Sequence, residues 1–504
     1  MIRLAAFFGL TASVVFAQPP AIAPGRIVNS ASLLPTSLPG GKLAPGARIL
    51  VPGIRFVDPG SRTTVRFGQG TWSVSTNPIT VNDMNLEVVV PPETPAGEVG
   101  ISVVNGQGSS RPEKVDVTAS SPAIVTLNGQ GWGPVLAGPV RKHQMLTIPL
   151  NGANRIPPKV FVGGVAAHGV KLRGEQLSFV VPSGAPEGCW TPLWLESPGG
   201  EVSNFATISI HKRDGTCDQP RGWFAPPLLA GKRHAAVVLE RISGAMEVIP
   251  GKSQEFSFDS GAAFFFRSSP QVSPVQILPP ASTCTTYTGT LTVDLMQLFN
   301  PRNFVGSLNA LLDAGKELSV ESGENHKGEL PAATPGFHAA LLGGTLPIVW
   351  GPGTPLFFDP GAYKIQSDGS ASVAKLDMTV KVPPPFEWLN RSSVKEVDRS
   401  AGLDMEWSGL GRDRQMVIFA VSLDQTTSAL GTCLCVAPRQ ATHMKIPPYA
   451  LANFPATQRG GGIPLRFLIL LALPTSAGTQ PTPDGLDDAR AIFLEIQGKN
   501  VLFR

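Results

Sequence analysis

The 504-residue sequence has no concentration of charge of either sign. Its 41 Lys and Arg residues nearly balance 37 Asp and Glu residues, and no five basic residues occur in a row. A net charge of +4, scattered over the whole chain, gives no electrostatic basis for binding nucleic acid. Nucleic-acid-binding proteins are therefore an unfavoured class.

Catalytic and cofactor motifs are also missing. The chain has no G-x-S-x-G elbow, no H-E-x-x-H zinc motif, no P-loop, and no G-x-G-x-x-G loop before a helix. The seven histidines show no spacing typical of metal ligands: His143, His168, His211, His234, His326, His338 and His443. We therefore predict a protein without catalytic residues, without a cofactor and without a metal ion.

Glycine and proline are abundant instead. The 54 glycines and 49 prolines separate many short apolar runs, and hydrophobic residues make up 42% of the chain. This pattern is typical of all-β proteins, and the apolar share suffices for packed cores. Because one core rarely grows beyond about 250–300 residues, the length predicts about three or four domains. We expect tandem Ig-like β-sandwich domains with few short helices.

The N-terminus has the pattern of an export signal. Arg3 supplies the positive charge, residues 4–16 form the apolar segment, and Ala17 precedes the expected cleavage site. An uncleaved anchor is the alternative, although the apolar run is shorter than the roughly 20 residues of a membrane helix. Residues 467–473 are apolar too, but they predict a buried strand. We expect a mature chain without a transmembrane span, secreted or at the cell surface.

One design occurs twice, 91 residues apart. Residues 86–104 read LEVVVPPETPAGEVGISVV, and residues 177–195 read LSFVVPSGAPEGCWTPLWL. The turn residues Pro91, Pro95 and Gly97 recur at positions 182, 186 and 188. A strand enters this Pro/Gly turn and a second strand leaves it, among about seven short strands per repeat. A period of about 90 residues predicts one sandwich per repeat, because solenoid repeats are shorter.

These repeats resemble the TIG (IPT) Ig-like domains over roughly residues 45–212. The resemblance rests on V-x-F-G at 65–68, V-x-V-G-G at 160–164, and V-V-P-x-x-x-P-x-G at 180–188, which recurs with one extra proline at 89–97. N-G at 105–106 and S-P-G-G at 197–200 complete the pattern. The resemblance implies two-sheet sandwiches that serve as spacers, adhesion modules or domain contacts, with no shared active site.

The rest of the chain divides by composition. We predict a signal peptide at 1–17, sandwiches at 18–118 and 119–212, a Pro/Gly linker at 213–232, a β-rich domain at 233–382 and a sandwich-type domain at 383–504. Residues 293–298 and 305–314 could form a short helix in place of strands, because Leu308, Leu311 and Leu312 have helical spacing. Residues 448–454 predict one helical turn.

The last 150 residues resemble a large set of uncharacterised exported bacterial proteins in which this part follows Ig-like modules. The resemblance rests on FDPGAY at 358–363, EWLNR at 387–391, VDRSAGL at 397–403, EWSG at 406–409 and GLD at 485–487. No activity is generally assigned to such proteins. The resemblance therefore adds an exported context and no chemistry.

The five cysteines favour disulfides over a zinc site, because Cys433-x-Cys435 is only half of a zinc-type set and the chain carries an export signal. Cys189 and Cys217 flank the closing strands of the second sandwich, so we pair them. Cys433 and Cys435 point to one face of a strand, and one of them meets Cys284. We choose Cys435, because the resembling proteins have a buried aromatic in the position of Cys433, which would be a free, buried thiol.

Three further groups have a functional alternative that we consider weaker. The acidic loop with Asp484, Asp487 and Asp488 lacks the residue order of a calcium site, so a solvated turn is favoured. Glu387 and Glu406 are a candidate glycosidase pair only if a cleft joins them. Four tryptophans offer a sugar platform or, as we favour, packing surfaces: Trp132, Trp190, Trp194 and Trp223.

The sequence thus predicts an exported, non-catalytic structural or adhesive protein built from tandem β-sandwiches. A carbohydrate- or matrix-binding protein that uses exposed aromatic side chains is the alternative, and a hydrolase with an unrecognised site in 233–504 is the third. The sequence does not identify the partner, for which a surface protein or a polysaccharide is the expected class.

Overall fold

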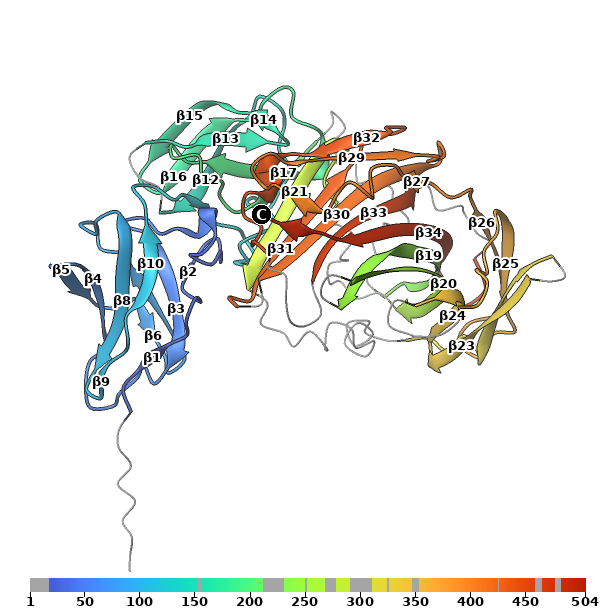
Figure 1. Cartoon of the computed structure of the whole chain (residues 1–504), viewed down its shortest axis with the longest axis horizontal. Helices are drawn as coiled ribbons and strands as arrows, with labels where there is room; N and C mark the ends of the chain where they lie inside the picture. The colour runs from blue at the N-terminus through green and yellow to red at the C-terminus, as the bar shows by residue number, and fades with distance from the viewer. Residues whose placement is uncertain are drawn as a thin grey trace, which may run out of the picture.

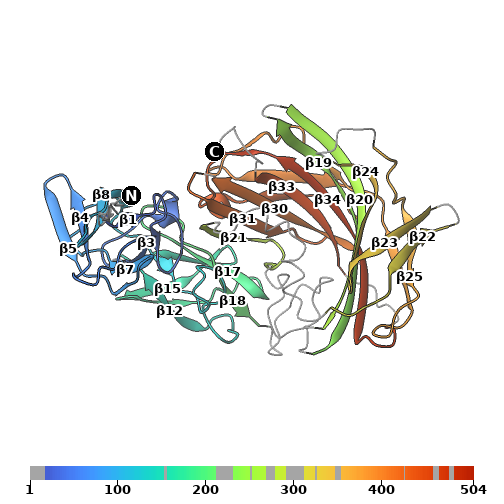
Figure 2. The ribbon, with the colours of Figure 1, turned by 90° about the horizontal axis from the view of Figure 1, so that it is seen from below.

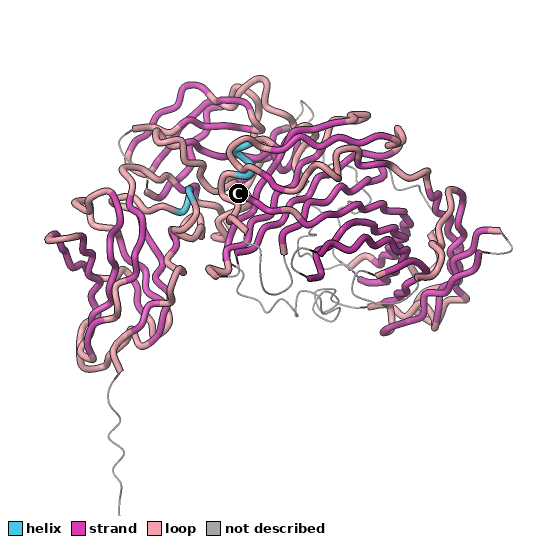
Figure 3. Tube along the Cα trace, in the orientation of Figure 1, coloured by secondary structure: helices cyan, strands magenta, loops and turns pink. Residues whose placement is uncertain are grey.

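The computed structural model describes residues 18–152, 156–211, 231–249, 252–267, 278–290, 311–323, 326–346, 353–424, 426–457, 465–475 and 482–504. The predicted all-β fold is confirmed: nearly all regular structure is strand, and Figure 3 shows short helical turns between long runs of strand. These turns are η1 (Pro39–Gly41) and α3 (Pro448–Leu451), the second within the predicted turn at 448–454. The predicted signal peptide lies outside the described residues.

The first sandwich occupies residues 18–118 and consists of two antiparallel sheets (Figure 1). One sheet has the order β1-β3-β7-β6, with β2 beside β3, and the other has the order β10-β8-β4-β5, with β9 beside β8. The strands are β1 (Ala21–Ile22), β2 (Val28–Asn29), β3 (Arg48–Ile54), β4 (Thr64–Gln69), β5 (Trp72–Thr76), β6 (Thr80–Val81), β7 (Asn85–Val89), β8 (Gly97–Asn105), β9 (Gly108–Ser109) and β10 (Glu113–Val117). Leu86 and Val88 are buried while Glu87 between them is not, as the two-residue period of a strand requires.

The second sandwich repeats this plan with the sheets β11-β12-β16-β15 and β14-β13-β17-β18. Its strands are β11 (Ala123–Ile124), β12 (Met145–Asn151), β13 (Lys159–Val162), β14 (Val165–Ala166), β15 (His168–Arg173), β16 (Gln176–Val180), β17 (Gly188–Glu196) and β18 (Ala206–Ile210). In both sandwiches the repeated Pro/Gly turn joins strands of opposite sheets, β7 to β8 and β16 to β17. The repeated sequence therefore encodes the step from one sheet to the other.

One twelve-stranded sheet extends through the rest of the chain, in the order β21-β31-β30-β33-β34-β19-β20-β24-β23-β22-β25-β26. Its strands are β19 (Arg233–Ile249), β20 (Lys252–Arg267), β21 (Thr283–Thr290), β22 (Glu317–Ser322), β23 (His326–Thr334), β24 (Phe337–Thr345), β25 (Gly361–Ser367), β26 (Leu376–Val382), β30 (Arg414–Asp424), β31 (Ala429–Val436), β33 (Arg466–Pro474) and β34 (Asp488–Asn500). Figure 2 shows how strongly this sheet curves. Its centre is the parallel pair β19 and β34, which aligns His234 with Asp488.

Two small sheets complete this region. β27 (Glu387–Trp388), β29 (Leu403–Ser408) and β32 (His443–Ile446) form one, and β28 (Glu396–Val397) and β35 (Leu502–Phe503) form the other. Trp388 and Trp407 pair across β27 and β29, and both are buried. These side chains cover the half of the large sheet that contains β30, β31 and β33.

The large sheet therefore contributes to two hydrophobic cores. The first core lies in what we call the curled lobe, formed by β19, β20 and β22 to β26. Here β26 packs against β34 and encloses Val237, Phe265 and Tyr363. The second core lies in what we call the stacked lobe, formed by β21, β27 to β33, α3 and β35. Here the small sheets cover a core that includes Trp407 and Leu470. The curled lobe comes mostly from the predicted segment 233–382, and the stacked lobe mostly from 383–504. The exception is β34, which lies in the middle of the sheet between the two lobes. The predicted boundary after residue 382 does not separate two sheets.

Of the other predicted segments, the structure describes the apolar one at 467–473. Residues 467–473 lie in β33, an inner strand of the large sheet with strands on both sides. The candidate helix at 305–314 and the linker at 213–232 fall largely outside the described residues. Within the part of the chain that the structure describes, no helix is long and apolar enough to cross a membrane.

A buried histidine is expected to make the stability of the curled lobe depend on pH. His338 on β24 is fully buried, and its Nε2 lies 3.1 Å from the carbonyl oxygen of Gly315. Burial lowers the pKa of His338, so the unfolded chain takes up this proton more readily than the folded one.

We expect the free energy of unfolding to fall as the pH drops below about 6.5, the ordinary histidine value. One proton accounts for a slope of at most about 1.4 kcal/mol per pH unit. Urea unfolding between pH 5 and 7.5 measures this slope, and His338→Gln should flatten it. An equal slope in that variant would assign the effect to another group.

Candidate functional site

The most distinctive site is a junction where the two sandwiches and the stacked lobe meet. Asn453, just after α3, is 2% exposed and bonds to both sandwiches. Its Oδ1 accepts the N–H of Gly40 in the first sandwich at 2.8 Å. Its Nδ2 donates to the carbonyl oxygens of Val202 at 2.8 Å and Ser203 at 3.1 Å in the second. A single side-chain amide thus satisfies backbone groups of both sandwiches.

Aromatic rings surround this junction. Trp194 stacks on Phe161 and Phe205 within the second sandwich, with ring centroids 5.3 Å apart in both pairs. Tyr449 from α3 stacks on the same indole at 4.1 Å, and burial raises the pKa of its hydroxyl. Stacked pairs contribute about 0.5–1.5 kcal/mol beyond the area they bury. The second sandwich and the stacked lobe are therefore joined by a hydrophobic contact as well as by hydrogen bonds.

The two sandwiches are also joined directly to each other. Asn151 at the end of β12 accepts the backbone N–H of Arg48 at 2.8 Å and donates back to its carbonyl oxygen at 2.8 Å. The same amide donates to the Oδ1 of Asn29 at 2.9 Å. Asn151 and Asn29 are both buried. Every pair among the three parts is thus joined by buried polar contacts.

Two of the four tryptophans considered for a sugar platform, Trp132 and Trp194, lie at contacts between parts of the chain. Trp194 is 2% exposed at the junction, and Trp132 packs edge-on against Tyr287 of β21, 5.3 Å away. Trp190 is half-buried, and Trp223 lies outside the described residues. Among the described residues, no exposed large apolar side chain is aromatic. Packing, the favoured interpretation, matches the observed positions of Trp132 and Trp194.

Three sulfur atoms gather in the core of the stacked lobe. Cys284 and Cys435 face each other on β21 and β31 and form a disulfide, with Cα atoms 4.0 Å apart. Cys433 is a free, buried cysteine whose Sγ lies 3.7 Å from that of Cys435. Burial raises the pKa of the Cys433 thiol to about 12, so it stays protonated at neutral pH. The predicted partner of Cys189, Cys217, lies outside the described residues.

The remaining candidates do not assemble into a catalytic or metal site. Asp487 accepts from Lys232 at 3.1 Å, and Asp488 from Arg490 at 2.9 Å, so basic groups neutralise these carboxylates. Glu387 and Glu406 are exposed on the outer face of the small sheet. Within the described residues, the cysteine trio is the one group of three or more Cys, His, Asp or Glu side chains close enough to share a metal ion.

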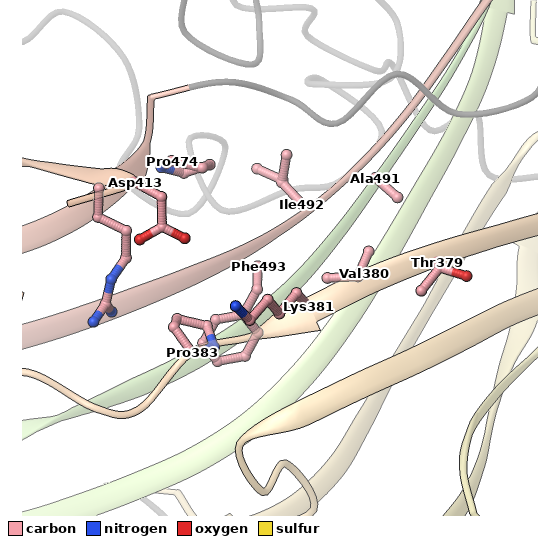
Figure 4. Close-up of a pocket in the computed structure, with 10 residues that line it drawn as sticks. Thr379, Val380, Lys381, Pro383, Asp413, Pro474, Ala491, Ile492 and Phe493 are labelled. Carbon is pink, nitrogen blue, oxygen red and sulfur yellow. The ribbon is translucent and has the colours of Figure 1, made fainter. Parts of the chain in front are cut away.

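A cavity of about 210 Å³ lies between the two lobes. Figure 4 shows its walls, to which β26 contributes Lys381, β34 contributes Ile492 and Phe493, and the turn before β30 contributes Asp413. No sequence pattern pointed to this cavity, because its walls come from separate segments between residues 379 and 493.

No family model and no curated protein matches this chain. Among solved structures, it is similar to a Bacteroides ovatus SGBP-B of a mixed-linkage glucan utilization locus, in complex with a heptasaccharide, at 14% identity and a TM-score of 0.21. That match covers 45% of this chain and 65% of the other. An SGBP-B of a Bacteroides uniformis xyloglucan utilization locus matches at 13% identity and TM-score 0.17, over 66% of this chain and 88% of the other.

A third match is to immunoglobulin domains 1–4 of Sidekick-1, at 10% identity and TM-score 0.14, over 92% of this chain and 95% of the other. The TIG resemblance thus has no family match behind it. At these TM-scores the matches support no conclusion about ligand or activity.

Proposed function

We propose that this protein is an exported, non-catalytic structural or adhesive protein that holds two sandwiches at a fixed angle to a large β-sheet domain. Its work is to space or present surfaces outside the cytoplasm. A disulfide in a buried core suits an oxidising compartment, and the N-terminal pattern of the sequence agrees with export.

The junction at Asn453 is the observation that carries this proposal. Contacts between domains of one chain are usually polar and permit relative motion. Here a buried amide bonds to both sandwiches, and Tyr449 stacks on Trp194 beside it. A protein that only tethered its domains would have no need of such a contact, whereas a rigid spacer depends on it.

Asn453→Ala is expected to loosen the junction. The substitution leaves the N–H of Gly40 and the carbonyl oxygen of Val202 buried without their partner, and each such group costs about 1–3 kcal/mol. Amide hydrogen exchange should accelerate at Gly40, and small-angle scattering should require several arrangements in place of one.

Asn82→Ala is the matched control, because Asn82 bonds only to the backbone of its own exposed turn, at Met84 and Asn85. It should leave exchange at Gly40 and the scattering curve unchanged. A wild-type protein whose scattering already needs many arrangements would contradict the rigid-spacer function.

The non-catalytic part of the proposal has a separate test. A screen of esterase, protease and glycosidase substrates with the purified mature protein is expected to give no turnover above background. A glycan array on the same sample tests the carbohydrate-binding alternative. Turnover that disappears when one Ser, His, Asp or Glu is replaced would overturn the proposal.

A further inference from the structure

The cavity between the lobes is positioned by a split in the large sheet. β33 pairs with β34 only at residues 495–500, while β19 pairs with β34 from Asp488 onward. Among the described strands, therefore, none pairs with the second edge of β34 around Ile492. β26, the last strand of the sheet, packs across this opening. Ligand sites are common where sheets divide and where domains meet.

The innermost polar group of the cavity is Arg414. Its side chain is 3% exposed, and its Nη1 donates to Glu495 at 2.9 Å. Its Nη2 donates to the carbonyl oxygens of Pro384 at 2.8 Å and Gly409 at 3.2 Å. The third guanidinium nitrogen, Nε, has no hydrogen-bond partner and almost no accessible surface. A ligand in the cavity does not reach this nitrogen, so Arg414 shapes the wall through its bonds to Pro384 and Gly409 and leaves binding to other side chains.

Two exposed charges of opposite sign line the same cavity (Figure 4). Lys381 on β26 and Asp413 before β30 each lack an ion-pair partner among the described residues. Between them the walls are apolar, with Val380, Ile492 and Phe493. The cavity thus offers one unpaired ammonium, one unpaired carboxylate and an apolar surface.

We propose that this cavity binds a free α-amino acid with an apolar side chain. Its carboxylate accepts from the ammonium of Lys381, its ammonium donates to Asp413, and its side chain lies against Ile492 and Phe493. This inference goes beyond the spacer function and does not rest on it. A volume of about 210 Å³ is below the roughly 300–1,000 Å³ of drug-sized pockets, which favours so small a ligand.

Other small ligands satisfy fewer of these groups. A neutral sugar leaves both exposed charges without a counter-ion, and the walls offer it no exposed aromatic face. A simple carboxylate such as acetate leaves Asp413 unpaired and the apolar wall uncovered. A zwitterion with an apolar side chain is the class that matches all three features at once.

The test is calorimetric titration of the full mature chain with leucine, leucinamide, N-acetylleucine, glucuronate and acetate. We expect leucine to bind and each analogue, which lacks one or more of its groups, to bind at least about tenfold more weakly. Methyl NMR of the same chain should show the signal of Ile492 shifting with leucine.

Lys381→Met should weaken leucine binding about tenfold, as should Asp413→Asn, without a change in Tm, because both side chains are exposed. Lys364→Met, an exposed lysine on the neighbouring strand β25, is the matched control and should bind as the wild type does. No leucine binding, or binding that Lys381→Met leaves unchanged, would overturn the proposal. Equal binding of leucine and glucuronate would assign the cavity to carboxylates in general and would overturn it too.

Discussion

Asp259→Ala is expected to lower the free energy of unfolding by about 3–5 kcal/mol, the cost of leaving a buried charge without its partner. Asp259 on β20 is fully buried and holds the guanidinium of Arg241, with Nε and Nη2 each 2.8 Å from a carboxylate oxygen. It also accepts the N–H groups of Phe357 and Phe358, each at 2.7 Å. Removal of the carboxylate therefore disrupts four contacts in the curled lobe.

Urea unfolding at neutral pH measures this loss, and two further variants interpret it. Asp377→Ala, an exposed carboxylate on β26, should change the free energy of unfolding by less than about 0.5 kcal/mol. Replacing both partners, with Arg241→Met and Asp259→Leu together, should restore only the part of the loss that comes from the unpaired guanidinium, because the N–H groups of Phe357 and Phe358 still lack their acceptor. A loss below about 1 kcal/mol in Asp259→Ala would show that water replaces the carboxylate.

The sequence predicted those features that depend on neighbouring residues. Alternation within strands and the turn repeated after 91 residues predicted both sandwiches, because a side-chain period of two and a Pro/Gly turn are local properties. The single large sheet could not be predicted in this way. Its central pair aligns Ala235 with Ala489, and no local pattern specifies which strand lies beside another so far along the chain.

In the candidate site, too, the sequence predicted only what depends on neighbouring residues or on a resemblance. The choice of Cys435 as the partner of Cys284 used strand geometry and a resemblance, and the structure has that disulfide. Asn453 was missed, since an asparagine after a helical turn is ordinary and its partner Gly40 stands 413 positions away. The role of Tyr449 at the junction was likewise invisible, because stacking on Trp194 depends on how two separately folded parts meet.

Cys284→Ser is expected to lower the free energy of unfolding by about 5 kcal/mol. Its disulfide with Cys435 spans a sequence separation of 151 residues, and in the chain-entropy model a loop of that length gives a stabilisation of about this size. Cys433→Ser is the control, because it removes a neighbouring buried thiol and leaves the disulfide intact. It should cost far less, and equal losses in both variants would attribute the effect to packing.

Cys435→Ser should cost less than Cys284→Ser, although both variants remove one half of the same disulfide. Cys433 lies on the same face of β31, and the three Sγ atoms are within 4.8 Å of one another. With Cys435 absent, Cys433 can pair with Cys284 during oxidative folding, before burial raises its pKa to about 12. Non-reducing peptide mapping of Cys435→Ser should therefore recover a Cys284–Cys433 peptide. Recovery of both cysteines as free thiols, with equal losses of stability in the two variants, would show that the backbone of β31 cannot accept the alternative bridge.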